Sequence, residues 1–234
     1  MKKMILSAVM LVFAASGRAQ EAGAASPTEH NEWLTTFEAV AVDADLDIKF
    51  VKVPDTEAPK IVYDTKGSYT SKFRAEVKDK TLRISEKYDS RRPDRTQVTV
   101  YYNTLQSVSL SGAAAVFEGT VDAVLLDLTL GRKASLTAAF YVKDLRMELT
   151  GGSATLTGKA GYLTLFASTG RVAASGLEVM SAEVNAQSKA DVSLWITDRF
   201  IGKTTTNARI TYKGQPAVVR GGAKFMGGEI SHVE

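Results

Sequence analysis

The sequence lacks cysteine entirely, and its 234 residues include only two histidines, His30 and His232. Without cysteine the chain has no thiol nucleophile, no disulfide and no thiolate metal site. The two histidines lie near opposite ends of the chain, so they do not have the spacing of metal ligands or of a histidine-based triad. The sequence therefore indicates no cofactor, no metal ion and no catalytic residue.

Long hydrophobic runs are also missing, apart from one near the N-terminus. There, two lysines precede an apolar stretch over residues 4–15, and small side chains follow at Gly17 and Ala19. This stretch is too short to cross a bilayer, which needs about 20 residues. We therefore expect residues 1–19 to be a signal peptide and not a retained anchor. The mature chain would then have no transmembrane segment and would be periplasmic, displayed at the cell surface or secreted.

Outside residues 1–19, the chain has no excess of positive or of negative charge. The formal net charge is +3, but residues 1–19 contain three basic residues and no acid, so the remainder is formally neutral. A neutral chain has no whole-molecule attraction for nucleic acid or for an anionic lipid surface. We expect no nucleic-acid partner.

What the sequence does contain is a series of short strand patterns. Residues 20–32 are small and polar without periodicity, which predicts a flexible leader before a single domain over residues 33–234. Apolar and polar residues alternate over residues 45–50 and 73–77. The dipeptide Asp79–Lys80 follows the second of these segments and predicts a hairpin to the next strand.

The second half of the chain repeats a pattern of a small residue, any residue and an aliphatic residue, at steps of 16 to 20 residues. Short strands at such a period, with no helix between them, are typical of stacked β-coils. Since neighbouring coils would lie about 4.8 Å apart, we expect the small and the aliphatic positions to form two inward columns in which like residues stack. The triplets are Ala114–Val116, Ala134–Leu136, Ala154–Leu156, Gly170–Val172, Ala190–Val192 and Ala208–Ile210.

Two architectures fit this repeat. An antiparallel sandwich has strands at similar spacing, whereas a solenoid also needs the same kind of residue at the same corner of every repeat. The small or glycine corners favour the solenoid. We therefore predict an all-β fold with an N-terminal strand-rich cap over residues 33–104, about six coils over 105–215, and a C-terminal cap over 216–234.

Four segments carry a resemblance to a known family: Phe37–Phe50 (FEAVAVDADLDIKF), Val77–Ile84 (VKDKTLRI), Leu105–Gly112 (LQSVSLSG) and Ile210–Ile230 (ITYKGQPAVVRGGAKFMGGEI). Together they resemble the Bacteroidetes family called putative auto-transporter adhesin, head GIN domain, a domain of unknown function. The resemblance covers roughly residues 37–230 and implies a right-handed parallel β-helix. The family name implies adhesion, but no catalytic or ligand-binding residue transfers to this chain. The chain departs from the family where Gln187–Ser188 and Thr206–Asn207 replace the serine–glycine corner seen at Ser111–Gly112.

The candidate site lies on the predicted outer face of the coils. Alternation places the central residue of each triplet outwards, and in the last three triplets these residues form a ladder of alternating charge. Such a ladder is either an exposed row of ion pairs that contributes little energy, or part of a polar binding groove. The outward residues are Ala115, Ser135, Thr155 and the ladder residues Arg171, Asp191 and Arg209.

Two further groups of residues allow more than one interpretation. Five aromatic side chains are either packed in the core or available to stack on sugar rings. Three aspartates at alternating positions share one face of a strand, which we interpret as its wet side and not as a calcium loop. These groups are Tyr101, Tyr102, Tyr141, Tyr162 and Trp195, and Asp43, Asp45 and Asp47.

We therefore expect an exported, non-enzymatic binding protein of the cell envelope, an adhesin that recognises an unidentified glycan or protein through an outer β-face. One alternative is a carbohydrate-active enzyme, a polysaccharide lyase or hydrolase built on a β-helix. Glycoside hydrolysis needs two carboxyl groups about 5 to 9.5 Å apart, but the ladder offers Asp191 alone between two arginines. The other alternative is an envelope scaffold without a ligand.

Overall fold

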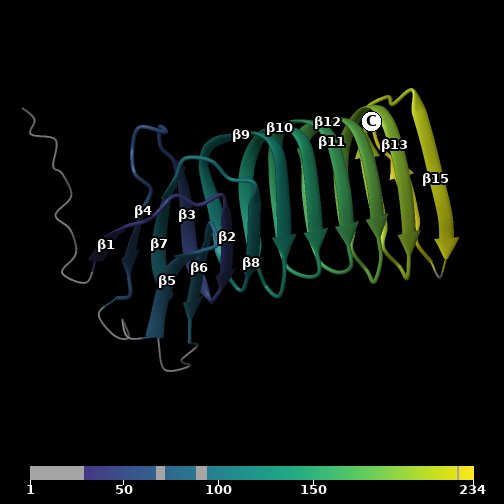
Figure 1. The fold of residues 1–234 in the computed structure, drawn as a ribbon. Coiled ribbons are helices and arrows are strands. Elements are labelled where there is room, and N and C mark those ends of the chain that lie inside the picture. The colour runs from purple at the N-terminus through teal and green to yellow at the C-terminus, as the bar shows by residue number, and fades with distance from the viewer. Residues whose placement is uncertain (1–28, 67–71, 88–93, 226) are drawn as a thin grey trace, which may run out of the picture.

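The computed structural model describes residues 29–66, 72–87, 94–225 and 227–234, and every element within them is a strand (Figure 1). The expected signal peptide, residues 1–19, lies outside the described residues. The strands are β1 (Glu29–Trp33), β2 (Ala39–Asp43), β3 (Leu46–Lys52), β4 (Lys60–Asp64), β5 (Phe73–Lys78), β6 (Thr81–Glu86), β7 (Thr96–Tyr102), β8 (Ser107–Ser111), β9 (Ala114–Leu130), β10 (Ser135–Leu149), β11 (Ser153–Ala167), β12 (Arg171–Ala186), β13 (Asp191–Thr205), β14 (Arg209–Lys213), β15 (Val218–Phe225) and β16 (Glu229–His232).

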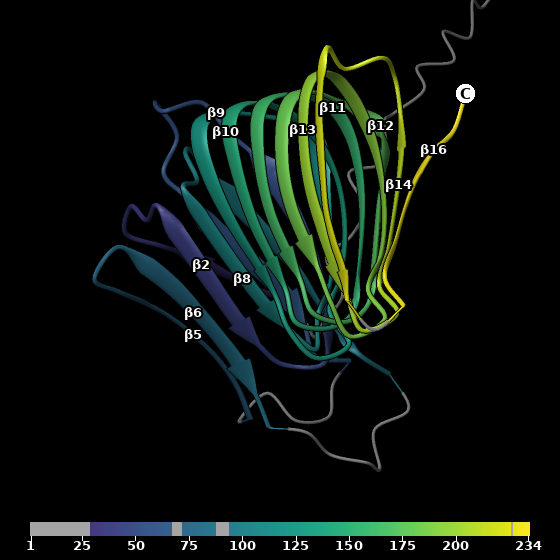
Figure 2. The same ribbon diagram turned by 90° about the vertical axis from the view of Figure 1, so that its right-hand side faces the viewer.

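Strands β9 to β13 form the body of a β-solenoid of about six turns. Each of these strands is 15 to 17 residues long and pairs in parallel with the strand of the next coil. Figure 2 looks along the stack and shows each long strand bending around the coil. The parallel pairing confirms the predicted solenoid and excludes the antiparallel sandwich.

The core lies inside the coils. Alternate side chains point inwards from each strand, so residues that pair across neighbouring strands stack into buried columns. Each fully buried aliphatic or aromatic side chain stabilises the fold by about 1.5–3 kcal/mol. One such column consists of Leu126, Leu145, Leu163, Ala182 and Phe200, each at most 2% exposed.

The N-terminal strands extend this stack in an order that differs from the chain order. Strand β3 lies between β7 and β9, and strand β2 lies between β6 and β8, all in parallel. Strands β6 and β7, which come later in the chain, therefore pair with β2 and β3 on the side away from the coils. Antiparallel strands β1, β4 and β5 pair at the far side of this region. The expected cap is present as these mixed strands.

The hairpin predicted at Asp79–Lys80 is confirmed. Strands β5 and β6 pair antiparallel, and the two turn residues have φ angles of 50° and 56°. Two consecutive positive φ angles are what a two-residue hairpin turn requires, because they match the twist of the flanking strands. At the N-terminal boundary, β1 begins at Glu29, inside the segment expected to be a leader.

The predicted inward columns hold for the later coils and are wrong for the earlier ones. Val172 pairs with Val192 as predicted, but Leu136 pairs with Ala154 and with Ala115. Ala115 is consequently buried at 2% exposure, although it was expected on the outer face, and Val116 is 47% exposed. The reason is that Ala113 and Ala115 occupy two successive inward positions in the first coil and Ala154 lies beside Leu136 in the third, so an alanine does not mark one fixed place.

The outer row is corrected in the same way. Ser135 pairs with Ser153 and with Ala114, so these residues take the places that we assigned to Thr155 and Ala115. Register shifts at the corners, such as the one between Thr137 and Ala139, change the number of residues in a coil without changing the inward pattern.

Candidate functional site

The predicted ladder lies where strands β12, β13 and β14 begin. Arg171 is in register with Asp191, and Asp191 is in register with Arg209. Arg171 Nη2 lies 3.2 Å from Asp191 Oδ2. Arg209 forms its ion pair with Glu229 on β16, at 3.3 Å between Nε and Oε2. The three predicted residues are adjacent, and a fourth charged residue extends the ladder.

Glu229 could have been found from the sequence. Gly228–Glu229–Ile230 repeats the pattern of a small, any and an aliphatic residue, and Ile230 pairs with Ile210 as the repeat requires. The four ladder side chains are all more than 40% exposed. Exposed ion pairs of this kind contribute about 0–1 kcal/mol each, so the ladder offers alternating donors and acceptors on a flat strand surface but little stability.

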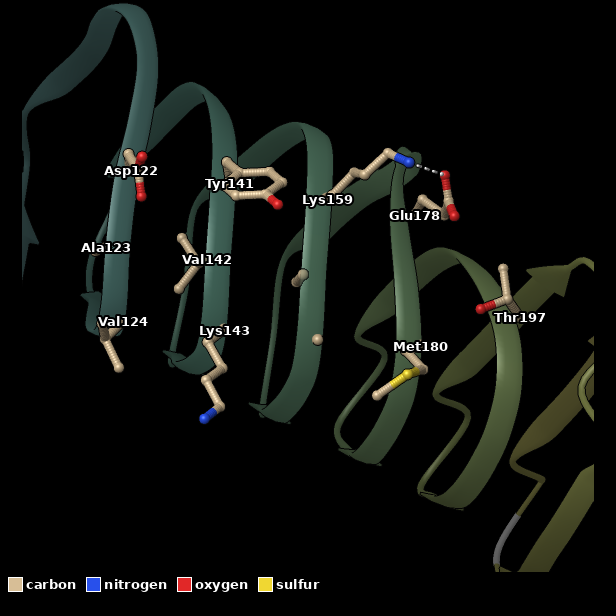
Figure 3. A pocket seen from close by; sticks show the side chains of 12 residues that line it. Asp122, Ala123, Val124, Tyr141, Val142, Lys143, Lys159, Glu178, Met180 and Thr197 are labelled. Carbon is tan, nitrogen blue, oxygen red and sulfur yellow. Dashed lines mark ion pairs between the residues drawn. The ribbon is translucent and has the colours of Figure 1, made fainter.

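A second outer surface is hollowed into a groove. It crosses strands β9 to β13 on another part of each strand, and its volume is about 470 Å³ (Figure 3). In one row across it, Tyr141 is in register with Asp122 and with Lys159. Lys159 is in register with Glu178 and forms an ion pair with it, at 3.3 Å between Nζ and Oε2. The sequence analysis did not identify this groove.

Small residues make the floor of the groove. Ala123, Ala160 and Gly161 line it between the longer side chains. Gly161 lies against the neighbouring coil, because a β-carbon built on it would be 2.7 Å from the carbonyl oxygen of Lys143. The absence of a side chain at this position keeps the surface open between β10 and β12, and a larger residue there would push the coils apart.

The rim of the groove exposes large apolar side chains. Val124 is 74% exposed, Tyr141 is 61% exposed and Met180 is 45% exposed. Figure 3 shows Tyr141 extending sideways from β10 towards β11. These three side chains come from β9, β10 and β12 and add apolar surface to a lining that also carries charged groups.

The other aromatic candidates have different environments. Tyr102 is a core residue at 2% exposure, and burial raises the pKa of its phenol to about 12. Trp195 is partly buried, with Lys213 Nζ 4.7 Å from the centre of its ring. Tyr162 is 49% exposed on β11, outside the groove lining. Tyr102 is thus packed in the core, whereas the rings of Tyr141 and Tyr162 are exposed at the surface.

The three aspartates face the solvent as expected, but they do not share one strand: Asp43 ends β2, Asp45 lies in the turn and Asp47 belongs to β3. Two of them bind a cation from the protein itself. Arg95 Nη2 lies 2.6 Å from Asp45 Oδ1, and Arg95 Nη1 lies 2.8 Å from Asp47 Oδ1. Across the described parts of the chain, no group of three or more histidine, cysteine, aspartate or glutamate side chains is placed to hold a metal ion.

Within the described residues, no helix is long and apolar enough to span a membrane. The family model described as "Putative auto-transporter adhesin, head GIN domain" matches residues 36–216. No curated protein matches the chain.

Three solved structures share the fold. A putative adhesin from Bacteroides fragilis has a TM-score of 0.77 at 19% identity, covering 88% of this chain and 96% of its own. A putative adhesin from Parabacteroides distasonis has a TM-score of 0.70 at 20% identity, with the same coverage. A structure from the same species described as a putative lipid binding protein has a TM-score of 0.65 at 15% identity, again covering 88% of this chain and 96% of its own. Sequence identities this low support a shared fold and do not support a shared function.

Proposed function

The chain belongs to the putative auto-transporter adhesin, head GIN domain family, and from this premise we propose that it is a non-enzymatic binding protein of the cell envelope that contacts a glycan or a protein through an outer face of its coils. A family of this description implies a location outside the cytoplasm. Export through the N-terminal signal peptide, residues 1–19, is part of the proposal.

The observation that carries the proposal is the groove across β9 to β13. Five successive coils contribute side chains to it, and its rim exposes Val124, Tyr141 and Met180 to solvent. A solenoid places outward residues of successive coils about 4.8 Å apart, which suits a ligand that extends over several coils. Solenoids use such extended surfaces for binding.

The arrangement of the acids supports binding over hydrolysis. Asp191 is paired with Arg171, and Glu178 is paired with Lys159, so each of these two acids has a basic partner. A glycosidase needs one carboxylic acid that can give up a proton beside a second carboxylate. None of the structural relatives named above is described as an enzyme.

The test separates binding from cleavage. The exported product of the full-length sequence is mixed with defined polysaccharides and with envelope protein extract, and each mixture is resolved by size-exclusion chromatography. Co-elution with an unshortened polysaccharide or with an envelope protein is the expected result. A polysaccharide that becomes shorter would overturn the proposal in favour of an enzyme, and the absence of any complex would favour a scaffold without a ligand.

A further inference from the structure

We infer that the groove across β9 to β13 binds an uncharged polysaccharide, with one sugar ring stacked on Tyr141. The inference rests on the proposed binding function and names its site and the chemical class of its ligand. Four properties of the groove carry it: its length, the exposed ring, the balance of charge and the shallow floor.

The length of the groove selects an extended ligand. The row from Asp122 through Tyr141 and Lys159 to Glu178 takes one residue from each of four adjacent strands. Adjacent strands are about 4.8 Å apart, so this row is roughly 14 Å long. Several linked sugars fit such a row, whereas a single sugar would fill only part of it.

The ring of Tyr141 provides an apolar platform with a polar end. It is 61% exposed at the rim of the groove, and on β10 it is in register with Asp122 on one side and Lys159 on the other. A tyrosine ring buries a large area and loses little conformational freedom on binding. A sugar ring matches this platform because one of its faces consists mainly of C–H groups while its hydroxyls point to the sides.

The charges around the platform favour an uncharged ligand. Asp122 and Glu178 contribute two negative charges, and Lys143 and Lys159 contribute two positive charges, so the lining is formally neutral. Carboxylates accept hydrogen bonds from hydroxyl groups, and ammonium groups donate to them. An anionic polymer would gain no net attraction, because its charges would meet the two acids as well as the two lysines.

The shape of the groove distinguishes a polysaccharide from other partners. The floor of Ala123, Ala160 and Gly161 is shallow and open, and of the charged side chains around it Asp122, Lys143 and Lys159 are exposed while Glu178 is half-buried. An acyl chain would need an enclosed apolar cavity to be removed from water. A protein interface would need about 800 Å² of surface on each partner, with a central apolar cluster shielded from water.

The test uses Tyr141→Ala in the full-length, exported protein. Native gels containing dextran, mannan, laminarin or xylan retard a protein that binds the polymer, and the retardation gives the affinity. We expect retardation by at least one of these neutral polymers, and Tyr141→Ala should weaken it by about tenfold or more. Tyr141→Phe keeps the ring and should bind within a few fold of the wild type.

Tyr162→Ala is the matched control. Tyr162 is also an exposed tyrosine of these coils, 49% exposed on β11, but it does not line the groove. This variant should bind like the wild type, and the melting temperatures of all three variants should agree with that of the wild type. If the alanine variants do not fold, their melting temperatures will show it. Tyr141→Phe, which keeps the ring, then measures what the hydroxyl alone contributes to binding.

The outcomes separate the inference from the proposed function. Undiminished neutral-polymer binding by Tyr141→Ala would overturn the groove as the site and leave a binding protein in place. Retardation only by alginate, or binding only to phosphatidylcholine vesicles or to an envelope protein, would overturn the ligand class. Shortened polymers would overturn the proposed function itself.

Discussion

Arg95 Nη2 lies 2.6 Å from Asp45 Oδ1, and through this contact the start of β7 is joined to the turn before β3. The same nitrogen donates to the carbonyl oxygens of Leu46 and Gly112, each at 3.1 Å. Gly112 lies between β8 and β9, so one guanidinium connects three layers of the stack. These layers are distant in sequence, and their order in space differs from their order in the chain.

Arg95→Ala should therefore lower the free energy of unfolding by about 2 kcal/mol, because it leaves two backbone carbonyls and two aspartates without their donor. Arg95→Lys should cost less but should not restore the wild type, since an ammonium cannot reproduce the planar fork. Urea denaturation measures both. Arg132→Ala is the control, because Arg132 is 85% exposed and 3.5 Å from Asp43, and it should change stability by less than about 0.5 kcal/mol. Equal losses from Arg95→Ala and Arg132→Ala would contradict the connecting role.

Gly152 is predicted to be indispensable at the corner between β10 and β11. Its φ angle is 81°, and a β-carbon there would collide with the backbone of Ala134. Gly152→Ala should lower stability by about 3 kcal/mol, through the left-handed backbone and the collision together. Gly119→Ala separates the two causes, because Gly119 has a φ of 78° with open space around it. It should cost only about 1 kcal/mol, and thermal melting that ranks the two variants equally would refute the steric argument.

Stability should decline at alkaline pH through Tyr102. Burial raises the pKa of this phenol from 10.0 to about 12. An unfolded tyrosine loses its proton near pH 10 while the folded one keeps it, so the stabilisation is fully present below pH 10 and is lost as the pH rises towards 12. The loss is about 3 kcal/mol at most, since one pKa unit is worth about 1.4 kcal/mol. Tyr63 contributes in the same direction, because burial and its hydrogen bond to Glu32 raise its pKa to about 12.

The measurement is urea denaturation at several pH values from about 9 to about 11.5, a range that brackets the unfolded tyrosine pKa of about 10. Tyr102→Phe should show a smaller decline than the wild type. If Tyr102→Phe declines as steeply as the wild type, another group causes the alkaline loss.

The ladder and the groove can be distinguished as binding surfaces. Replacing Arg171 and Arg209 together by alanine removes both guanidiniums from the ladder and should change stability by less than about 1 kcal/mol, because both pairs are exposed. Polysaccharide binding that depends on Tyr141 should remain within about twofold of the wild type, a change worth roughly 0.4 kcal/mol. Loss of binding with an intact fold would instead assign the site to the ladder.

The sequence by itself determined the features that depend on local periodicity. The recurring triplets predicted the coils, because every coil must place small or aliphatic side chains inwards at the same corner. The hairpin at Asp79–Lys80 followed from turn chemistry between two alternating segments. The order Arg171, Asp191, Arg209 was also correct, because in these three coils the small and the aliphatic residue of the triplet occupy the same two inward positions.

Only the tertiary structure decided which residues lie side by side elsewhere. Leu136 pairs with Ala154 and not with Leu156, although β10 and β11 pair without a register shift, because a small residue can occupy either of two successive inward positions and the pattern of residue types does not tell which. The groove unites side chains from five strands, and Tyr141 lines it while Tyr102 is buried in the core, although both belong to strands of ordinary pattern. Exposure depends on what the neighbouring coils place beside a residue, and register across coils is a property of the folded stack.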